Sequence, residues 1–305
     1  MEETRPPVPN PDGQVLPGTS TLVAYLNFVK FPHTLFALPF ALLGVVAASA
    51  TTALHWRTVA LAVVAFAAAR WAALGFNMIV DLRYDLVNPR NQRRELPRGA
   101  LTLRQAWVSV AVAGAIFLAA SAAINPLCAR LAPIALAWVM TYSFAKRFTN
   151  WPHLWLGISL AIAPVGGWLA VTGRWSEPAW ALVAIIVAVA TWTAGFDIFY
   201  SLPDEQFDRA QGLHSLVARF GVPATLGIAR GLHLLTVPAL ALFGLGVGFG
   251  MWYFVGVVAA AAILLYEHSL VRAGDLSRLD AAFFTMNAVM SATVLGFALL
   301  DRVLR

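Results

Sequence analysis

The sequence is poor in charge and has a single cysteine. Only 12% of its 305 residues are Asp, Glu, Lys or Arg, whereas a soluble domain carries about 25%. Cys128 alone excludes an internal disulfide and a cysteine metal cluster. No two histidines have the spacing of a metal motif such as HExxH, so we expect no zinc site. Strand-like alternation is absent, which argues against a membrane β-barrel.

Apolar residues dominate instead. They make up 60% of the chain, and the mean hydropathy is +0.73. A membrane-spanning helix needs about 20 mostly apolar residues. Nine such segments predict an all-α polytopic membrane bundle of about nine transmembrane helices. The segments are 22–49, 58–82, 105–124, 132–149, 153–172, 178–201, 223–245, 248–271 and 280–303.

The distribution of positive charge predicts the orientation. Residues 1–21 are polar and proline-rich, so we expect a flexible cytoplasmic tail before a single transmembrane domain, 22–305. The loops after the even-numbered spans hold Arg83, Arg90, Arg93, Arg94, Arg98, Arg104, Lys146, Arg147, Arg209, Arg219, Arg272 and Arg278. The opposite loops hold only Arg57, Arg130 and Arg174. The positive-inside rule therefore places the N-terminus and the even-numbered loops in the cytoplasm, in a bacterial-type inner (plasma) membrane. Because topology accounts for the charge, no nucleic-acid partner is expected.

Two acidic segments end even-numbered spans. One reads GFNMIVDLRYD from Gly75, and the other reads GFDIFYSLPDEQFD from Gly195. Each contains Asp-x-x-x-Asp, formed by Asp81 and Asp85 in the first and by Asp204 and Asp208 in the second. Pro203 predicts a break in the second helix. The similarity indicates a weak internal repeat, 22–149 and 153–271.

Paired carboxylates one helical turn apart repel each other, and ionisable residues at a membrane edge are usually functional. A divalent cation relieves the repulsion. Mg²⁺ is typically held by one or two carboxylates together with substrate phosphates, and arginines bind phosphate oxygens directly. The pattern thus favours a metal-bridged diphosphate whose remainder lies in the membrane. A solvated helix end with local ion pairs is the alternative for either segment alone.

The motifs also resemble those of the UbiA superfamily of intramembrane aromatic prenyltransferases, particularly its 4-hydroxybenzoate polyprenyltransferase branch. Asn77, Asp81 and Asp85 match the first motif of the family, and NPRNQRRELPRG at 88–99 resembles its arginine-rich run. Further matches are Tyr142 and Lys146 in YSFAKR, Asp204 and Asp208 preceded by Asp197, KFPHTLFALPFALLG at 30–44 and GLHSLVARFG at 212–221. Asn91 stands where relatives often carry Thr, a loop position where we expect little effect.

The resemblance implies helices around a central cavity and a cytoplasmic cap made by loops 2-3 and 6-7. It also implies a polyprenyl diphosphate donor, a small aromatic acid as acceptor, and Mg²⁺. The expected catalytic residues are Asp81, Asp85, Asp204 and Asp208, and Asn77 and Asp197 join them as metal ligands. Arg90, Arg94, Lys146 and Arg147 are expected to bind diphosphate, and Arg70, Tyr142 and Tyr200 to line the acceptor cavity. We expect the spans within 223–303, which contain almost no charge, to surround the prenyl tail and His153 to lie at the membrane interface.

The predicted function is transfer of a polyprenyl group to 4-hydroxybenzoate in ubiquinone biosynthesis. Prenylation of a dihydroxynaphthoate in menaquinone biosynthesis is the alternative within the class. A cation-coupled transporter is the alternative from another class. Transporter sites lie near the bilayer midplane, however, and the neighbouring arginines here favour an anion.

Overall fold

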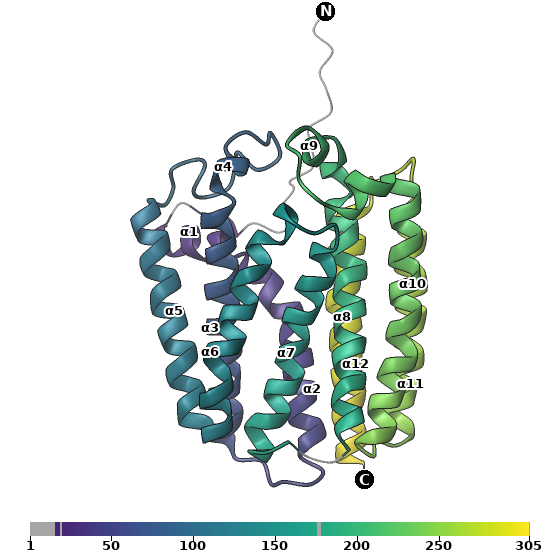
Figure 1. Cartoon of the computed structure of the whole chain (residues 1–305). Helices are drawn as coiled ribbons and strands as arrows, with labels where there is room; N and C mark the ends of the chain where they lie inside the picture. The colour runs from purple at the N-terminus through teal and green to yellow at the C-terminus, as the bar shows by residue number, and fades with distance from the viewer. Residues whose placement is uncertain (1–15, 19, 176–177, 305) are drawn as a thin grey trace, which may run out of the picture.

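The computed structural model describes residues 16–18, 20–175 and 178–304, which form one bundle of long helices (Figure 1). Nine helices in this part of the chain are long and apolar enough to cross a membrane, as the sequence predicted. They are built on α2 (Phe31–Ala48), α3 (Trp56–Val80), α5 (Leu103–Ile124), α6 (Pro126–Thr141), α7 (Pro152–Thr172), α8 (Ala179–Ser201), α10 (Leu216–Gly246), α11 (Met251–Leu270) and α12 (Asn287–Val303). A 3₁₀ helix, η1 (Tyr142–Arg147), extends α6, and a π-helix, η3 (Ala281–Met286), precedes α12.

The predicted first span is two helices, so the expectation of one continuous helix over 22–49 is wrong. α1 (Thr21–Phe28) ends before Lys30, whose backbone is left-handed at φ 46° and ψ 54°. An α-helix cannot continue through such a residue, and Pro32 in the first turn of α2 favours a new start there. Of the predicted tail, residues 1–15 lie outside the described part. Leu16 is already fixed, because its N–H donates to Asn27 Oδ1 at 2.9 Å.

Side-chain caps determine where other helices begin. Thr102 and Gln105 form a capping box at the start of α5. Asn125 caps α6 by accepting from the Cys128 N–H at 2.8 Å, and Pro126 occupies the first turn. α6 therefore starts at 126 rather than at the predicted 132. The Asn125 amide also donates to the Leu169 carbonyl at 2.9 Å, which ties α6 to the end of α7.

Close backbone contacts join α2, α7 and α8. A Cβ added to Gly157 of α7 would lie 2.2 Å from the Ala190 carbonyl oxygen of α8. One added to Gly44 of α2 would lie 1.9 Å from the Pro164 carbonyl oxygen of α7. These glycines let backbones approach where any side chain would separate the helices. Gly167 packs in the same way against α2, whereas its neighbour Gly166 has open space beside its Cα.

Both acidic segments lie at one end of the bundle. Beyond α3 come α4 (Leu82–Asp85) and a loop, and beyond α8 come a 3₁₀ turn, η2 (Leu202–Asp204), and α9 (Glu205–Ala210). α4 and α9 both lie at this end, and the C-terminus lies at the other (Figure 1). We call residues 81–101 and 202–215 the cap. The predicted break at Pro203 is confirmed, since α8 stops at Ser201 and α9 starts at Glu205.

Candidate active site

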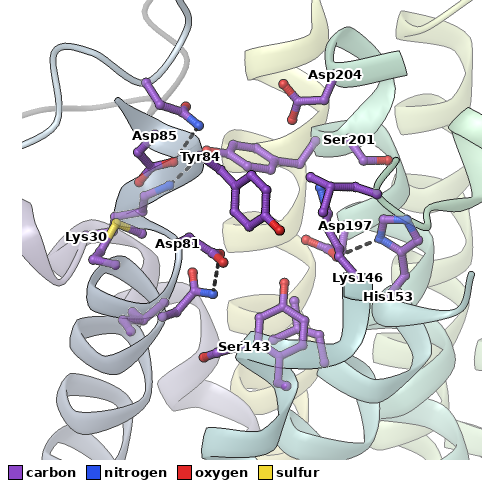
Figure 2. A pocket seen from close by; sticks show the side chains of 18 of the residues that line it. Lys30, Asp81, Tyr84, Asp85, Ser143, Lys146, His153, Asp197, Ser201 and Asp204 are labelled. Atoms are coloured by element: carbon purple, nitrogen blue, oxygen red, sulfur yellow. Dashed lines mark hydrogen bonds and ion pairs between the residues drawn. The ribbon is translucent and has the colours of Figure 1, made fainter. Parts of the chain in front are cut away.

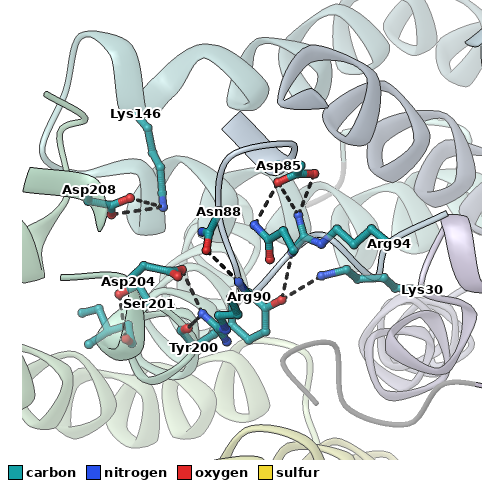
Figure 3. A network of polar contacts seen from close by, with 12 residues as sticks. Lys30, Asp85, Asn88, Arg90, Arg94, Lys146, Tyr200, Ser201, Asp204 and Asp208 are labelled. Atoms are coloured by element: carbon teal, nitrogen blue, oxygen red, sulfur yellow. Dashed lines mark hydrogen bonds and ion pairs between the residues drawn. The ribbon is translucent and has the colours of Figure 1, made fainter. Parts of the chain in front are cut away.

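The first acidic motif sits where α3 ends. Asp81 is the residue between α3 and α4, and Asn77, one turn earlier, donates its amide to Asp81 Oδ2 at 2.9 Å. Asp85 closes α4 and is 3% exposed. Arg94 Nη1 lies 3.0 Å from both of its oxygens, and Asn91 Nδ2 lies 2.9 Å from Oδ1 (Figure 3). Asn91 lies in a loop, as expected, and its amide holds a motif carboxylate; that it has little effect there stays a prediction.

The second acidic motif is met by cations from distant segments. Arg90 Nη1 contacts Asp204 Oδ2 at 2.9 Å, so a loop beside the first motif reaches across to the second (Figure 3). Lys146 Nζ lies 3.2 Å from Oδ2 of Asp208, which is 1% exposed. Three predicted phosphate-binding cations, Arg90, Arg94 and Lys146, are thus paired with the motif acids.

Arg147 has a different partner. Its Nη2 donates to the Val80 carbonyl at 3.1 Å, at the last residue of α3, and its guanidinium lies over the rings of Tyr84 and Phe144. A cation at a helix C-terminus is stabilised by the helix dipole. Arg147 therefore fixes the end of α3 next to Asp81.

One pocket collects these groups (Figure 2). It encloses about 170 Å³, and among the residues that line it are Asn77, Asp81, Asp85, Arg94, Lys146, Arg147, Asp197, Asp204 and Asp208. In the described part of the chain, no three His, Cys, Asp or Glu side chains converge closely enough to hold a metal ion by themselves. The arrangement consists instead of separate acids around a shared space.

Burial and neighbouring charges shift the pKa values of ionisable groups in and around the pocket. Burial, and then the charge of Asp85, raise the pKa of Asp81 to about 6 from its ordinary 3.8. Arg90 shows the opposite balance: despite burial, Tyr200 and Asp204 raise its pKa above the ordinary value. A carboxylate with a raised pKa gains from a cation brought close to it.

Tyr200 supports the cations of the pocket. Its hydroxyl accepts from Lys30 Nζ at 2.8 Å and from Arg94 Nη2 at 3.3 Å, and the Arg90 guanidinium lies 4.6 Å from its ring centre. The left-handed backbone of Lys30 turns the chain at the point where its side chain reaches Tyr200. The sequence offered no signal for this contact, because the two residues are 170 positions apart.

A second, apolar cavity lies beside the polar pocket. It encloses about 470 Å³ and is lined mainly by α2, α3, α5, α6 and α7. The two spaces share a boundary, because both are lined by Arg70, Leu74, Asn77, Tyr142, Leu156 and Leu160. No lining residue of the apolar cavity comes from α10, α11 or α12. Instead, α10 packs on α8, α12 packs on α2, and α11 packs on α10 and α12. The expectation that the spans within 223–303 surround the prenyl tail stays a prediction.

His153 has a partner that the sequence did not reveal. It is the second residue of α7 and is 2% exposed, and its Nδ1 lies 2.7 Å from Asp197 Oδ2. Its expected location at the membrane interface stays a prediction. Its position after the first Pro of a span gave no indication of this pairing, which depends on how α7 packs against α8.

The fold and the site define a class: a polytopic membrane protein with a polar pocket beside an apolar cavity. Comparison with known proteins agrees. The UbiA prenyltransferase family model matches residues 37–289, and the chain belongs to this family.

Individual relatives cover most of the chain. The 4-hydroxybenzoate octaprenyltransferase of Coxiella burnetii (strain RSA 331 / Henzerling II) is 28% identical over 282 residues, which are 91% of this chain and 96% of that protein. The structure of a UbiA homolog from Aeropyrum pernix K1, in its apo form, is 30% identical, covers 88% of this chain and 98% of its own, and has a TM-score of 0.80. A UbiA homolog from Archaeoglobus fulgidus bound to DMAPP and Mg²⁺ shares the fold at 21% identity with a TM-score of 0.70, covering 92% of this chain and 99% of its own.

Proposed function

We propose that this protein transfers a polyprenyl group from polyprenyl diphosphate to 4-hydroxybenzoate, in ubiquinone biosynthesis. One observation carries the proposal: a pocket of acids and cations adjoins an apolar cavity, and six residues line both. A polyprenyl diphosphate has the same two parts, a polyanionic head and an apolar tail. The name of the Coxiella relative supplies the acceptor.

The residues present fit Mg²⁺. The donors are hard oxygens, from Asp81 and Asp85 on one side and Asp204 and Asp208 on the other, with Asn77 beside Asp81. Burial and the neighbouring charge of Asp85 raise the pKa of Asp81, so a cation bound beside Asp81 would stabilise its ionised form. Mg²⁺ commonly takes one or two carboxylates and completes its shell with substrate phosphates and water, which agrees with acids that do not form a closed cage. The ligands DMAPP and Mg²⁺ in the Archaeoglobus homolog agree with this assignment.

When bound, Mg²⁺ would offset the negative charge that develops on the departing diphosphate. The protein's own cations act in the same direction. Lys146, Arg90 and Arg94 lie next to the acids, so they can move from carboxylate to phosphate oxygens over a short distance. The allylic C–O bond then breaks with its electron pair on the diphosphate, an acceptor ring carbon forms the new C–C bond, and that carbon loses its proton to the released diphosphate.

Arg70 is the group best placed for the acceptor's carboxylate. It lies at the junction of the two spaces, where the reacting carbon between head and tail must sit. Its Nη2 donates to the His33 carbonyl at 3.3 Å, but its buried Nε has no hydrogen-bond partner among the described residues. Leaving a buried donor without an acceptor costs about 1–3 kcal/mol, and a bound carboxylate removes that cost. Tyr142 and Tyr200 complete the polar lining of this region.

The experiment uses the purified full-length protein in lipid nanodiscs with a labelled polyprenyl diphosphate. Separate reactions contain 4-hydroxybenzoate or a dihydroxynaphthoate, each with Mg²⁺ or with EDTA. We expect prenylated 4-hydroxybenzoate with Mg²⁺ and no product with EDTA. Product only from the naphthoate would refute the acceptor, and no product from either would refute the transferase assignment. We also expect a protease added to right-side-out vesicles to spare the cap, because the positive-inside rule places it in the cytoplasm.

A further inference from the structure

The structure assigns a role to the pair formed by His153 and Asp197. We propose that Asp197 binds the hydroxyl group of the aromatic acceptor, and that His153 is a positioning residue that fixes the Asp197 carboxylate for this contact. The proposal rests on the proposed function, and it replaces the sequence-based expectation that Asp197 binds the metal.

The geometry of the pair is specific. The imidazole of His153, at the start of α7, lies 2.7 Å from Oδ2 of Asp197 on α8, and no other hydrogen bond to Asp197 occurs among the described residues. Figure 2 shows Asp197 between His153 and the open side of the pocket, across from Asp81. With Oδ2 occupied by His153, Oδ1 is the oxygen available to a molecule in the pocket.

The His153–Asp197 pair leaves one buried polar atom without a hydrogen bond to any described residue, which costs folding free energy. His153 Nε2 is buried and has no hydrogen-bond partner in the described part of the chain. A buried polar atom in this state normally requires an explanation, and a functional role is one of the few available.

Asp197 also differs in position from the acids of the second motif. It lies within α8, about one turn before that helix ends at Ser201, whereas Asp204 and Asp208 lie beyond the helix end in the cap. Asp85, Asp204 and Asp208 each have a lysine or arginine partner, whereas Asp197 has histidine. Asp197 lines the polar pocket together with Arg70 and Tyr142, and Arg70 and Tyr142 also line the apolar cavity.

Those positions match the two ends of the acceptor. 4-Hydroxybenzoate carries a carboxylate and a hydroxyl on opposite sides of one ring. Arg70 can hold the carboxylate, and Asp197 Oδ1 can accept a hydrogen bond from the hydroxyl. That bond increases electron density on the ring carbon next to the C–OH group, which is the carbon that attacks. The O–H bond stays intact, so the contact requires no proton transfer.

The test compares His153→Leu, which removes the hydrogen bond, with His153→Gln, whose side-chain amide can donate to Asp197. His214→Gln is the matched control, because His214 is an exposed cap histidine outside the pocket lining. For each variant we would measure KM for 4-hydroxybenzoate, KM for the donor, the Mg²⁺ concentration for half-maximal rate, and the inhibition constant of benzoate, which lacks the hydroxyl.

We expect His153→Leu to raise KM for 4-hydroxybenzoate roughly 10- to 100-fold, the range for a lost hydrogen bond to a charged group. Benzoate inhibition, donor KM and Mg²⁺ dependence should stay unchanged, and His153→Gln should recover most of the loss. A changed donor KM or Mg²⁺ dependence with an unchanged acceptor KM would return Asp197 to the metal site and overturn the proposal. If His153→Leu does not fold, Asp197→Asn decides by the same four readouts. An inactive wild-type protein would instead refute the proposed function.

Discussion

Replacing Asp81 by Asn should make the metal-free protein more stable while abolishing turnover. The carboxylate of Asp81 is buried beside Asp85, and these two factors, burial first, raise its pKa from 3.8 to about 6. The difference is roughly two pKa units, and at about 1.4 kcal/mol per unit, ionised Asp81 destabilises the folded protein by about 3 kcal/mol. The amide in Asp81→Asn removes this charge and can keep the hydrogen bond with Asn77.

The pH dependence follows from the direction of the shift. Because the folded state binds the Asp81 proton more tightly than the unfolded state, the wild-type protein loses stability as the pH rises from 3.8 to about 6. Asp81→Asn has no carboxylate at this position, so its stability does not fall with pH for this reason. Its advantage should therefore be complete at pH 8 and should vanish near pH 4.

The assay is thermal unfolding in detergent with EDTA at several pH values, with Asp275→Asn as an exposed control. An advantage of about 3 kcal/mol corresponds to a rise in Tm of several degrees. Adding Mg²⁺ with diphosphate should stabilise wild type much more than the variant. A variant less stable than wild type in EDTA at pH 8, or one stabilised equally by Mg²⁺ and diphosphate, would refute the reasoning.

Three further predictions concern other parts of the molecule. Arg94→Gln removes the cationic partner of Asp85, which is 3% exposed. We therefore expect roughly 3–5 kcal/mol of destabilisation, measured as a lower Tm in EDTA. A Tm equal to that of the exposed control Arg93→Gln would contradict this expectation. Gly157→Ala should lower Tm because its Cβ would lie 2.2 Å from the Ala190 carbonyl oxygen. Gly166→Ala should leave Tm unchanged because its Cβ would have nothing within 4 Å. An equal Tm for the two variants would rule out the close contact of α7 and α8. Glu267 is 0% exposed and has no cationic partner among the described residues, so Glu267→Gln should keep or raise Tm and retain activity. A clear fall in either would show that the carboxylate has a role we have not assigned.

Features with a strong local signal were predictable from the sequence. The nine candidate spans could be predicted because each apolar segment is long enough to cross a membrane as a helix. The location of both motifs at one end of the bundle could be predicted because each motif ends an even-numbered span. The break at Pro203 follows from the chemistry of proline. The location of the motifs at span ends also argued against the transporter alternative. The structure agrees with that location, since Asp81 lies at the end of α3 and Asp204 follows α8.

Features that depend on packing between distant segments were not predictable. Nothing near Lys30 shows that its side chain reaches Tyr200, and nothing near His153 shows that Asp197 will meet it on the adjacent helix. The position of the apolar cavity depends on which helices leave space between them. Composition alone could not distinguish the spans that line the cavity from the spans that pack tightly on one another. The internal repeat of 22–149 and 153–271 stays a prediction.

The most direct measurement is the binding of a non-reactive prenyl thiodiphosphate to wild type, Asp85→Asn and Asp208→Asn, by titration calorimetry with and without Mg²⁺. If both motifs hold one magnesium-bound diphosphate, binding requires Mg²⁺, and each substitution alone weakens it at least tenfold. Binding that persists in EDTA, or that depends on one motif and ignores the other, would contradict the shared site.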